Sequence, residues 1–71
     1  MELRYRIRRQ RIAAGISVSA LAKVLGVSRS WLSLREGGFT RVNDADAKRI
    51  YGAIHAIVEK RFNLVEEEMS A

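Results

Sequence analysis

The sequence predicts an all-α fold, a compact bundle of four to five helices, from three observations. The 71 residues contain no proline, and no segment alternates apolar and polar residues between turn dipeptides as a hairpin would. Apolar residues recur instead at intervals of three and four, the spacing of an amphipathic helix. Glycines separate these stretches at helical lengths. Because the chain is small and has no cysteine, a helical core or an interface between copies has to stabilise it.

The first helix is expected over residues 2–14. Ile7 and Ala14 lie on one side of it, with Ile12 beside them, and arginines occupy much of the remaining surface. Gly15 is expected to end this helix as a left-handed C-cap.

Two short helices are expected next, over residues 18–25 and 28–36. Ser17 and Ser28 are their N-caps, and Gly26 opens the tight turn that joins them. Because so short a turn leaves the two helices at a steep angle, this segment has the geometry of a helix-turn-helix.

A longer helix is expected over residues 44–62, capped by Asn43 or Asp44. Gly52 lies inside it and predicts a break or close packing against a neighbour. The inward stripe of this helix consists of Ala47, Ile50, Ile54 and Ile57.

Residues 1–62 are thus expected to form one domain. Residues 63–71 are an acidic tail that either adds a short last turn capped by Asn63 or frays. A second apolar stripe on the long helix either covers the first helix or forms a dimer surface. Its members are Tyr51, Val58, Phe62 and Val65.

The net charge of +5 is distributed unevenly along the chain. Residues 1–41 have nine Arg or Lys against two Glu, a net charge of +7, whereas residues 42–71 have four basic against six acidic residues, a net charge of −2. Arginine suits phosphate because its planar fork donates two parallel hydrogen bonds. The first helix lacks the broad apolar face of a membrane-surface helix. The asymmetry therefore favours nucleic acid as the partner, the alternative being a solvated charged face.

Several other classes of protein are not expected. No apolar run reaches the roughly 18–20 residues of a membrane span, and the N-terminus has no signal-like apolar region, so we expect a soluble, cytoplasmic protein. His55 is the single histidine and is expected at the surface. With no cysteine beside it, and no catalytic triad or paired carboxylates, we expect neither an enzyme nor a metal, a cofactor or a small-molecule ligand.

The segment SVSALAKVLGVSRSWLSLREGG has a specific order of small and apolar residues and follows the stretch RIAAGIS. The matching positions are Leu21-Ala22, Leu25-Gly26-Val27-Ser28, Leu32-Ser33, and Glu36 followed by Gly38. Over roughly residues 3–54 the chain resembles the lambda-repressor-like family, also called the Cro/repressor or xenobiotic-response-element class. The resemblance implies a DNA-binding domain and a small transcriptional regulator, such as a repressor, of a phage or a bacterial mobile element.

The same resemblance implies which residues contact DNA. The base-reading helix spans residues 28–36, and its outer positions are Ser28, Arg29, Ser30, Trp31, Ser33 and Leu34. Arg29 is the strongest candidate, since a bidentate Arg–guanine pair is the commonest specific contact in the major groove. Lys23, Arg41 and the backbone N–H groups at the start of residues 18–25 are expected to bind phosphates.

The resemblance also implies an ion pair between Arg11 and Glu36, buried or half-buried, that anchors the motif to the first helix. Between the two short helices, Ala22 has to be small where they cross, and Val27 and Leu32 fill the corner. These three residues are expected to be core and to contact no base.

Three positions depart from the family pattern. Val18 replaces a glutamine that usually touches DNA, Arg35 occupies an inward apolar position, and Trp31 stands where a smaller residue is usual. In one arrangement the helix is rotated, so that Trp31 and Leu34 pack inward and Arg35 swings out towards phosphate or an acid. In the other, Trp31 lies at the edge of the DNA interface and Arg35 pairs with an acid such as Glu2 or Glu36.

The sequence thus predicts a sequence-specific protein for double-stranded DNA, a homodimer on two half-sites because one module reads few base pairs. Two alternatives remain open. One is an accessory factor for recombination or transposition that uses the same motif to bend or bridge DNA. The other is an antitoxin-like module whose acidic tail binds a protein partner.

Overall fold

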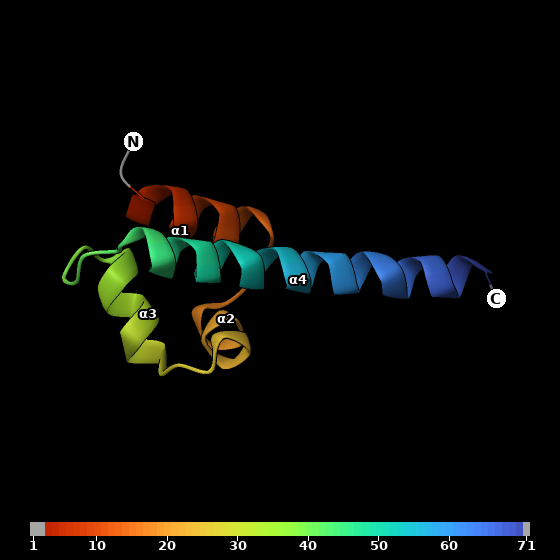
Figure 1. The fold of residues 1–71 in the computed structure, drawn as a ribbon. Helices are drawn as coiled ribbons and strands as arrows, with labels where there is room; N and C mark the ends of the chain where they lie inside the picture. Colours follow the sequence, from red (N-terminus) through yellow and green to blue (C-terminus); the bar gives the residue numbers. More distant parts are fainter. Residues whose placement is uncertain (1–2, 71) are drawn as a thin grey trace.

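The computed structural model describes residues 3–70 and has four α-helices and no strand in that range, which confirms the all-α prediction. The helices are α1 (Leu3–Ala13), α2 (Val18–Leu25), α3 (Arg29–Glu36) and α4 (Asp44–Ser70). α1 and α4 lie side by side, and α2 and α3 pack against them from one side (Figure 1).

Short polar side chains determine where the helices begin. The Ser17 hydroxyl accepts a hydrogen bond from the Ala20 N–H at 3.0 Å, and the Ser28 hydroxyl accepts one from the Trp31 N–H at 3.0 Å. Of the two caps considered for α4, Asn43 is the one observed, because its Oδ1 accepts from the N–H of the third residue of the helix at 2.7 Å. Gly26 has φ +72°, the left-handed conformation that reverses the chain between α2 and α3.

The core lies where all four helices meet. Its buried members are Ile7, Ile16, Leu21, Ala22, Leu32, Ile50, Ala53 and Ile54. Leu21, Leu32 and Ile50 have no exposed surface, so each helix after α1 contributes one fully enclosed side chain. Ile12 was expected beside this apolar side but is 58% exposed, because it lies on the face of α1 that points away from the bundle.

α4 is longer and more regular than the sequence predicts. It continues through residues 63–70, so neither a separate last turn capped by Asn63 nor a frayed tail is observed there. Gly52 neither breaks the helix nor packs closely, since a Cβ built on it would meet no atom within 4 Å. The second half of α4 extends beyond the bundle (Figure 1), and the longest dimension of the molecule is 46 Å against 25 and 19 Å for the other two. Within the described range, no helix is both long and apolar enough to cross a lipid bilayer.

Gly52→Ala is expected to raise the free energy of unfolding by about 0.5–1 kcal/mol, because alanine restricts the unfolded chain and its Cβ has open space here. Gly26→Ala is the matched control. Its Cβ also meets nothing, but the positive φ should cost it about 1–2 kcal/mol. Thermal unfolding followed by circular dichroism should therefore show Tm shifts of opposite sign, and a lower Tm for Gly52→Ala would contradict this account.

Candidate nucleic-acid interface

α3 separates a buried side from an exposed one. Leu32 is fully buried and Glu36 is 8% exposed on the inner side. The outer side consists of exposed side chains, most of them short: Ser28, Arg29, Ser30, Ser33 and Leu34. Because three of these are serines, a double helix can approach the backbone of α3 closely.

The polar groups of this surface can still bind a ligand. Ser28 uses an oxygen lone pair to cap α3, so its hydroxyl hydrogen remains able to donate. Arg29, Lys23 and Arg41 are exposed, and none of them makes a hydrogen bond or an ion pair with another residue in the range 3–70. These three cations can therefore bind an anionic partner without first breaking a contact of their own.

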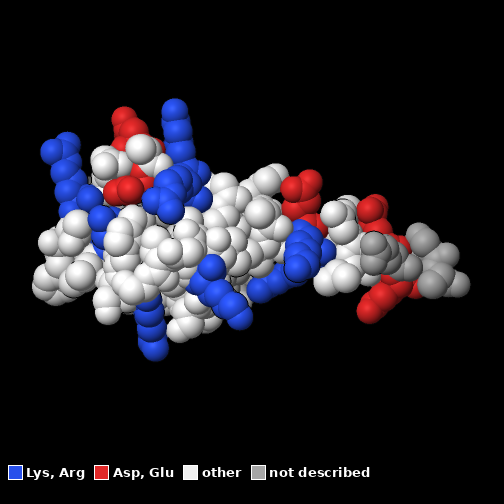
Figure 2. All heavy atoms as spheres, turned by 60° about the horizontal axis from the view of Figure 1, so that its bottom comes forward, with Lys and Arg blue, Asp and Glu red and all other residues white. Residues whose placement is uncertain are grey.

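The charges of the molecule are separated in space as well as in sequence. Figure 2 brings the side of α2 and α3 towards the viewer and shows Lys and Arg side chains distributed over the globular part. Acidic side chains lie near the first turn of α4, which contains Asp44 and Asp46, and along its projecting end. Most of the positive charge thus lies on the bundle, which also has a small acidic area, and the end of α4 is acidic.

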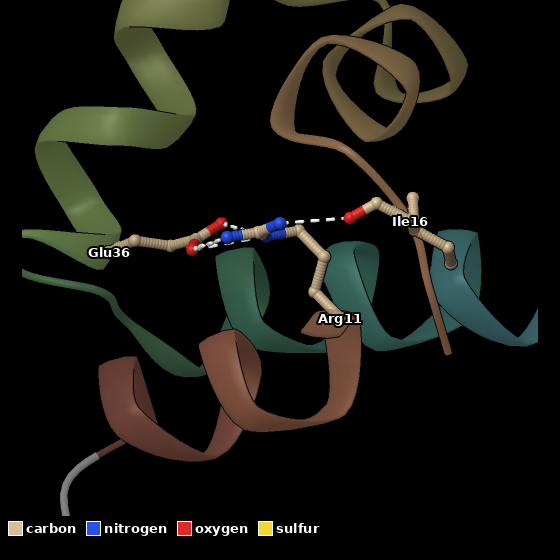
Figure 3. A network of polar contacts seen from close by, with 3 residues as sticks. All are labelled: Arg11, Ile16 and Glu36. Carbon is tan, nitrogen blue, oxygen red and sulfur yellow. Dashed lines mark hydrogen bonds and ion pairs between the residues drawn. The ribbon is translucent and has the colours of Figure 1, made fainter. Parts of the chain in front are cut away.

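The inner side of α3 is attached to α1 by an ion pair. The Arg11 guanidinium donates from Nε to both carboxylate oxygens of Glu36, at 3.1 and 2.9 Å, and from Nη2 to Oε1 at 2.8 Å. Its Nη1 donates to the carbonyl oxygen of Ile16 at 2.8 Å (Figure 3). The two side chains are 12% and 7% exposed. The pair implied by the resemblance is therefore present, and it joins α1, the loop before α2 and the end of α3.

The structure agrees with each of the two expected arrangements in part, since Trp31 packs against the core as in the first and Arg35 pairs with an acid as in the second. Leu34 is 45% exposed, so α3 is not rotated to bury it. Arg35 pairs with Asp46 in the first turn of α4, with Nε and Oδ2 3.5 Å apart, and both side chains are mostly buried. Glu36 is occupied by Arg11, and Glu2 lies outside the described residues.

Trp31 is half-buried and packs against the core. Arg35 donates to its carbonyl oxygen at 3.1 Å and places its guanidinium carbon 3.7 Å from the centroid of the indole ring. Arg49 lies 5.9 Å from the same centroid and donates to the carbonyl oxygen of Leu25. The indole is therefore part of the α3–α4 junction, and Arg35 covers one of its faces.

Sequence reasoning missed Asp46 and Arg49 as partners in this junction. The spacing of four between Trp31 and Arg35 predicts that the two side chains meet on one helix face. Nothing in the pattern showed which residue of α4 would face them, because that depends on how the loop after Gly38 directs the chain.

The second apolar stripe of α4 has two parts. Tyr51 is half-buried against the core, whereas Val58, Phe62 and Val65 are 43%, 62% and 53% exposed. The stripe therefore packs against the bundle at one end and is open at the other.

A family model described as a helix-turn-helix domain matches residues 2–56. The chain belongs to the helix-turn-helix domain family. The match covers α1, α2, α3 and the first half of α4. This membership supports binding of double-stranded DNA, and domains of the family are typically not enzymes. Searches among curated proteins and among solved structures gave no match.

Glu36→Gln is expected to lower the free energy of unfolding of the helix-turn-helix domain by about 3 kcal/mol, because it leaves the largely buried Arg11 charge without an anion. Urea titration measures this change. Glu59→Gln is the matched control, since the Glu59 carboxylate lies 3.8 Å from His55 Nε2 with both side chains mostly exposed. Its effect should stay within about 0.5 kcal/mol. Equal effects of the two substitutions would show that the Arg11 pair does not anchor α3.

Proposed function

We propose that this helix-turn-helix domain is a sequence-specific transcription regulator, of the lambda-repressor-like type, that inserts α3 into the major groove of double-stranded DNA. The observation that supports it most directly is the contrast between the two sides of α3. Leu32 and Glu36 fix its inner side to the scaffold, and its outer side is lined by serines beside an uncommitted Arg29. A regulator of this kind would belong to a phage or a mobile element and would act as a repressor.

Base recognition falls mainly to Arg29. Its guanidinium can donate two parallel hydrogen bonds to O6 and N7 of guanine. Ser28, Ser30 and Ser33 add short-range hydroxyl contacts, and Leu34 offers an apolar contact for a thymine methyl group. Trp31 stays at the rim of this surface, because its ring is largely used within the α3–α4 junction.

Phosphate binding falls to groups around α3. Lys23 and Arg41 are exposed and uncommitted on either side of it along the chain. The first N–H groups of α2 are a second source of donors, because the positive end of a helix favours phosphate. These contacts position the domain on the duplex and do not read its sequence.

The proposal is tested by selecting bound sequences from random duplexes with the full chain and then measuring affinity against salt. Affinity should fall steeply as salt rises, since each phosphate contact releases a counterion. No enrichment of any sequence would contradict sequence-specific binding. Footprints at the ends of a mobile element in place of promoters would favour the accessory recombination factor.

Arg29→Ala is expected to lower affinity for the selected site by roughly 10- to 100-fold and to relax preference at one base pair, because it removes the bidentate contact. Lys23→Ala should weaken selected and random duplexes equally and reduce the salt slope by about one. Arg8→Ala removes a positive charge four residues before the exposed Ile12, on the side of α1 that points away from the bundle, and is the control for net charge. The antitoxin-like module would be favoured by two results together. The parent chain would show no affinity for DNA, and the Arg29→Ala variant would still bind a protein partner.

A further inference from the structure

The end of α4 has an apolar face with nothing packed against it. Val58, Phe62, Val65 and Met69 follow one another at spacings of four, three and four, and they are 43%, 62%, 53% and 82% exposed. α1 ends before it reaches them: Arg61 Nη1 already donates to the carbonyl oxygen of Ala14, the residue after the last one of α1. These four residues are called the open stripe below.

Both features of the open stripe indicate an interface. Alternating spacings of three and four are the pattern of a seam between two helices, as in a coiled coil. A contiguous exposed apolar surface on a small protein marks a contact site. In addition, a helix that lacks tertiary support is only marginally stable in water over this length, so a partner would stabilise it.

We propose that the open stripe binds the open stripe of a second copy of this chain in antiparallel orientation. The inference rests on the proposed function in one respect, since it specifies how two helix-turn-helix domains are joined on DNA. In this arrangement Val58 lies opposite Met69 of the second copy and Phe62 opposite its Val65. All eight apolar side chains then face another apolar side chain.

Charge favours the antiparallel orientation. Residues 66–68 are three consecutive glutamates, whereas Lys60 and Arg61 lie at the other end of the open stripe. An antiparallel pair places each acidic end beside the basic end of the second copy, with Arg61 close to its Glu68. Glu59 then approaches Glu66 of the second copy, and the repulsion between these two carboxylates offsets part of the attraction between Arg61 and Glu68. A parallel pair would set Glu66 and Glu68 of one copy beside the same residues of the other.

The position of α1 favours the same orientation. α1 lies beside only the first part of α4, and the Arg61 side chain reaches back to its end (Figure 1). In a parallel pair the axes of the two α4 helices would be only about 10 Å apart, and both bundles would lie at the same end of this pair, so that they would compete for the same space. In an antiparallel pair the bundles lie at opposite ends.

The contact is small, and this determines its strength. Four side chains from each copy reach only the lower end of specific interfaces, roughly 1,000 Å² in total. We therefore expect a dimer that dissociates in the micromolar range and becomes dominant when two half-sites on one duplex hold both copies.

The arrangement also determines the distance between the two recognition helices. Arg35 of α3 is anchored to Asp46, and the symmetry axis passes between residues 63 and 64. At a rise of about 1.5 Å per residue, the two anchors are about 50 Å apart along α4. Because one turn of DNA is only about 34 Å, the half-sites are expected more than one turn apart, and selected sites one turn apart would overturn the antiparallel pair.

Analytical ultracentrifugation of the full chain without DNA tests the contact itself. The parent chain should show a monomer–dimer equilibrium in the micromolar range, and Phe62→Glu should raise the dissociation constant at least 100-fold. Leu64→Glu is the matched control, because Leu64 is 52% exposed in the same segment but points away from the open stripe. It should change the constant by less than threefold. A parent chain that stays monomeric at several hundred micromolar, or equal effects of the two variants, would overturn the proposal.

Cysteine cross-linking tests the orientation, and the chain has no cysteine of its own. Val58→Cys and Met69→Cys should form a disulfide-linked dimer rapidly when the two variants are mixed and slowly when either is alone. Rapid cross-linking of Val58→Cys alone would indicate a parallel pair and overturn the proposal. Because these measurements contain no DNA, failure of the contact is distinguished from failure of the proposed function. A monomeric Phe62→Glu variant should still bind a single half-site through Arg29.

Discussion

The ion pair between Arg11 and Glu36 is the contact on which the rest of this structure depends. Two helices and a loop meet at it, since the Arg11 guanidinium on α1 bonds the carboxylate at the end of α3 and the Ile16 carbonyl oxygen in the loop before α2. Two charges removed from water gain little net stability over apolar residues of the same size. The pair instead determines geometry. The planar guanidinium donates its hydrogen bonds in fixed directions, so the carboxylate fits in one position, and this fixes the end of α3 relative to α1.

A second arginine fixes α3 to α4 by different means. Arg35 uses its edge for Asp46 and for a backbone carbonyl, and its face for the Trp31 ring. The chain thus uses two of its arginines as internal braces and leaves others, Arg29 and Arg41 among them, on the outside. A count of positive charges therefore overstates the number available to a phosphate backbone. Of the available ones, Arg29 lies on α3, which contacts with α1 and α4 hold at its inner side.

Much of this architecture could be predicted from local chemistry. Ser17, Ser28 and Gly26 act at short range, so their neighbours in sequence were enough to place the ends of α2 and α3. The Arg11–Glu36 pair joins residues 25 apart and was accessible because the order of residues around it resembles a known family. The partner of Arg35 was not accessible, since it depends on the path of the loop to α4. The extent of α4 was also missed, because the glycine and the acidic residues that weaken a helix locally did not end it here.

The two halves of α4 illustrate why composition alone did not separate core from interface. Both halves have apolar residues at helical spacing, so the periodicity of the sequence does not distinguish them. Ile50 and Ile54 are buried because α1 and α2 end where they do, whereas Phe62 is exposed because no other element extends as far. Burial is thus decided by the lengths of neighbouring helices, a property of the whole chain. Where the apolar face of α4 continues beyond the other helices, its side chains can still be buried, but only against a second molecule.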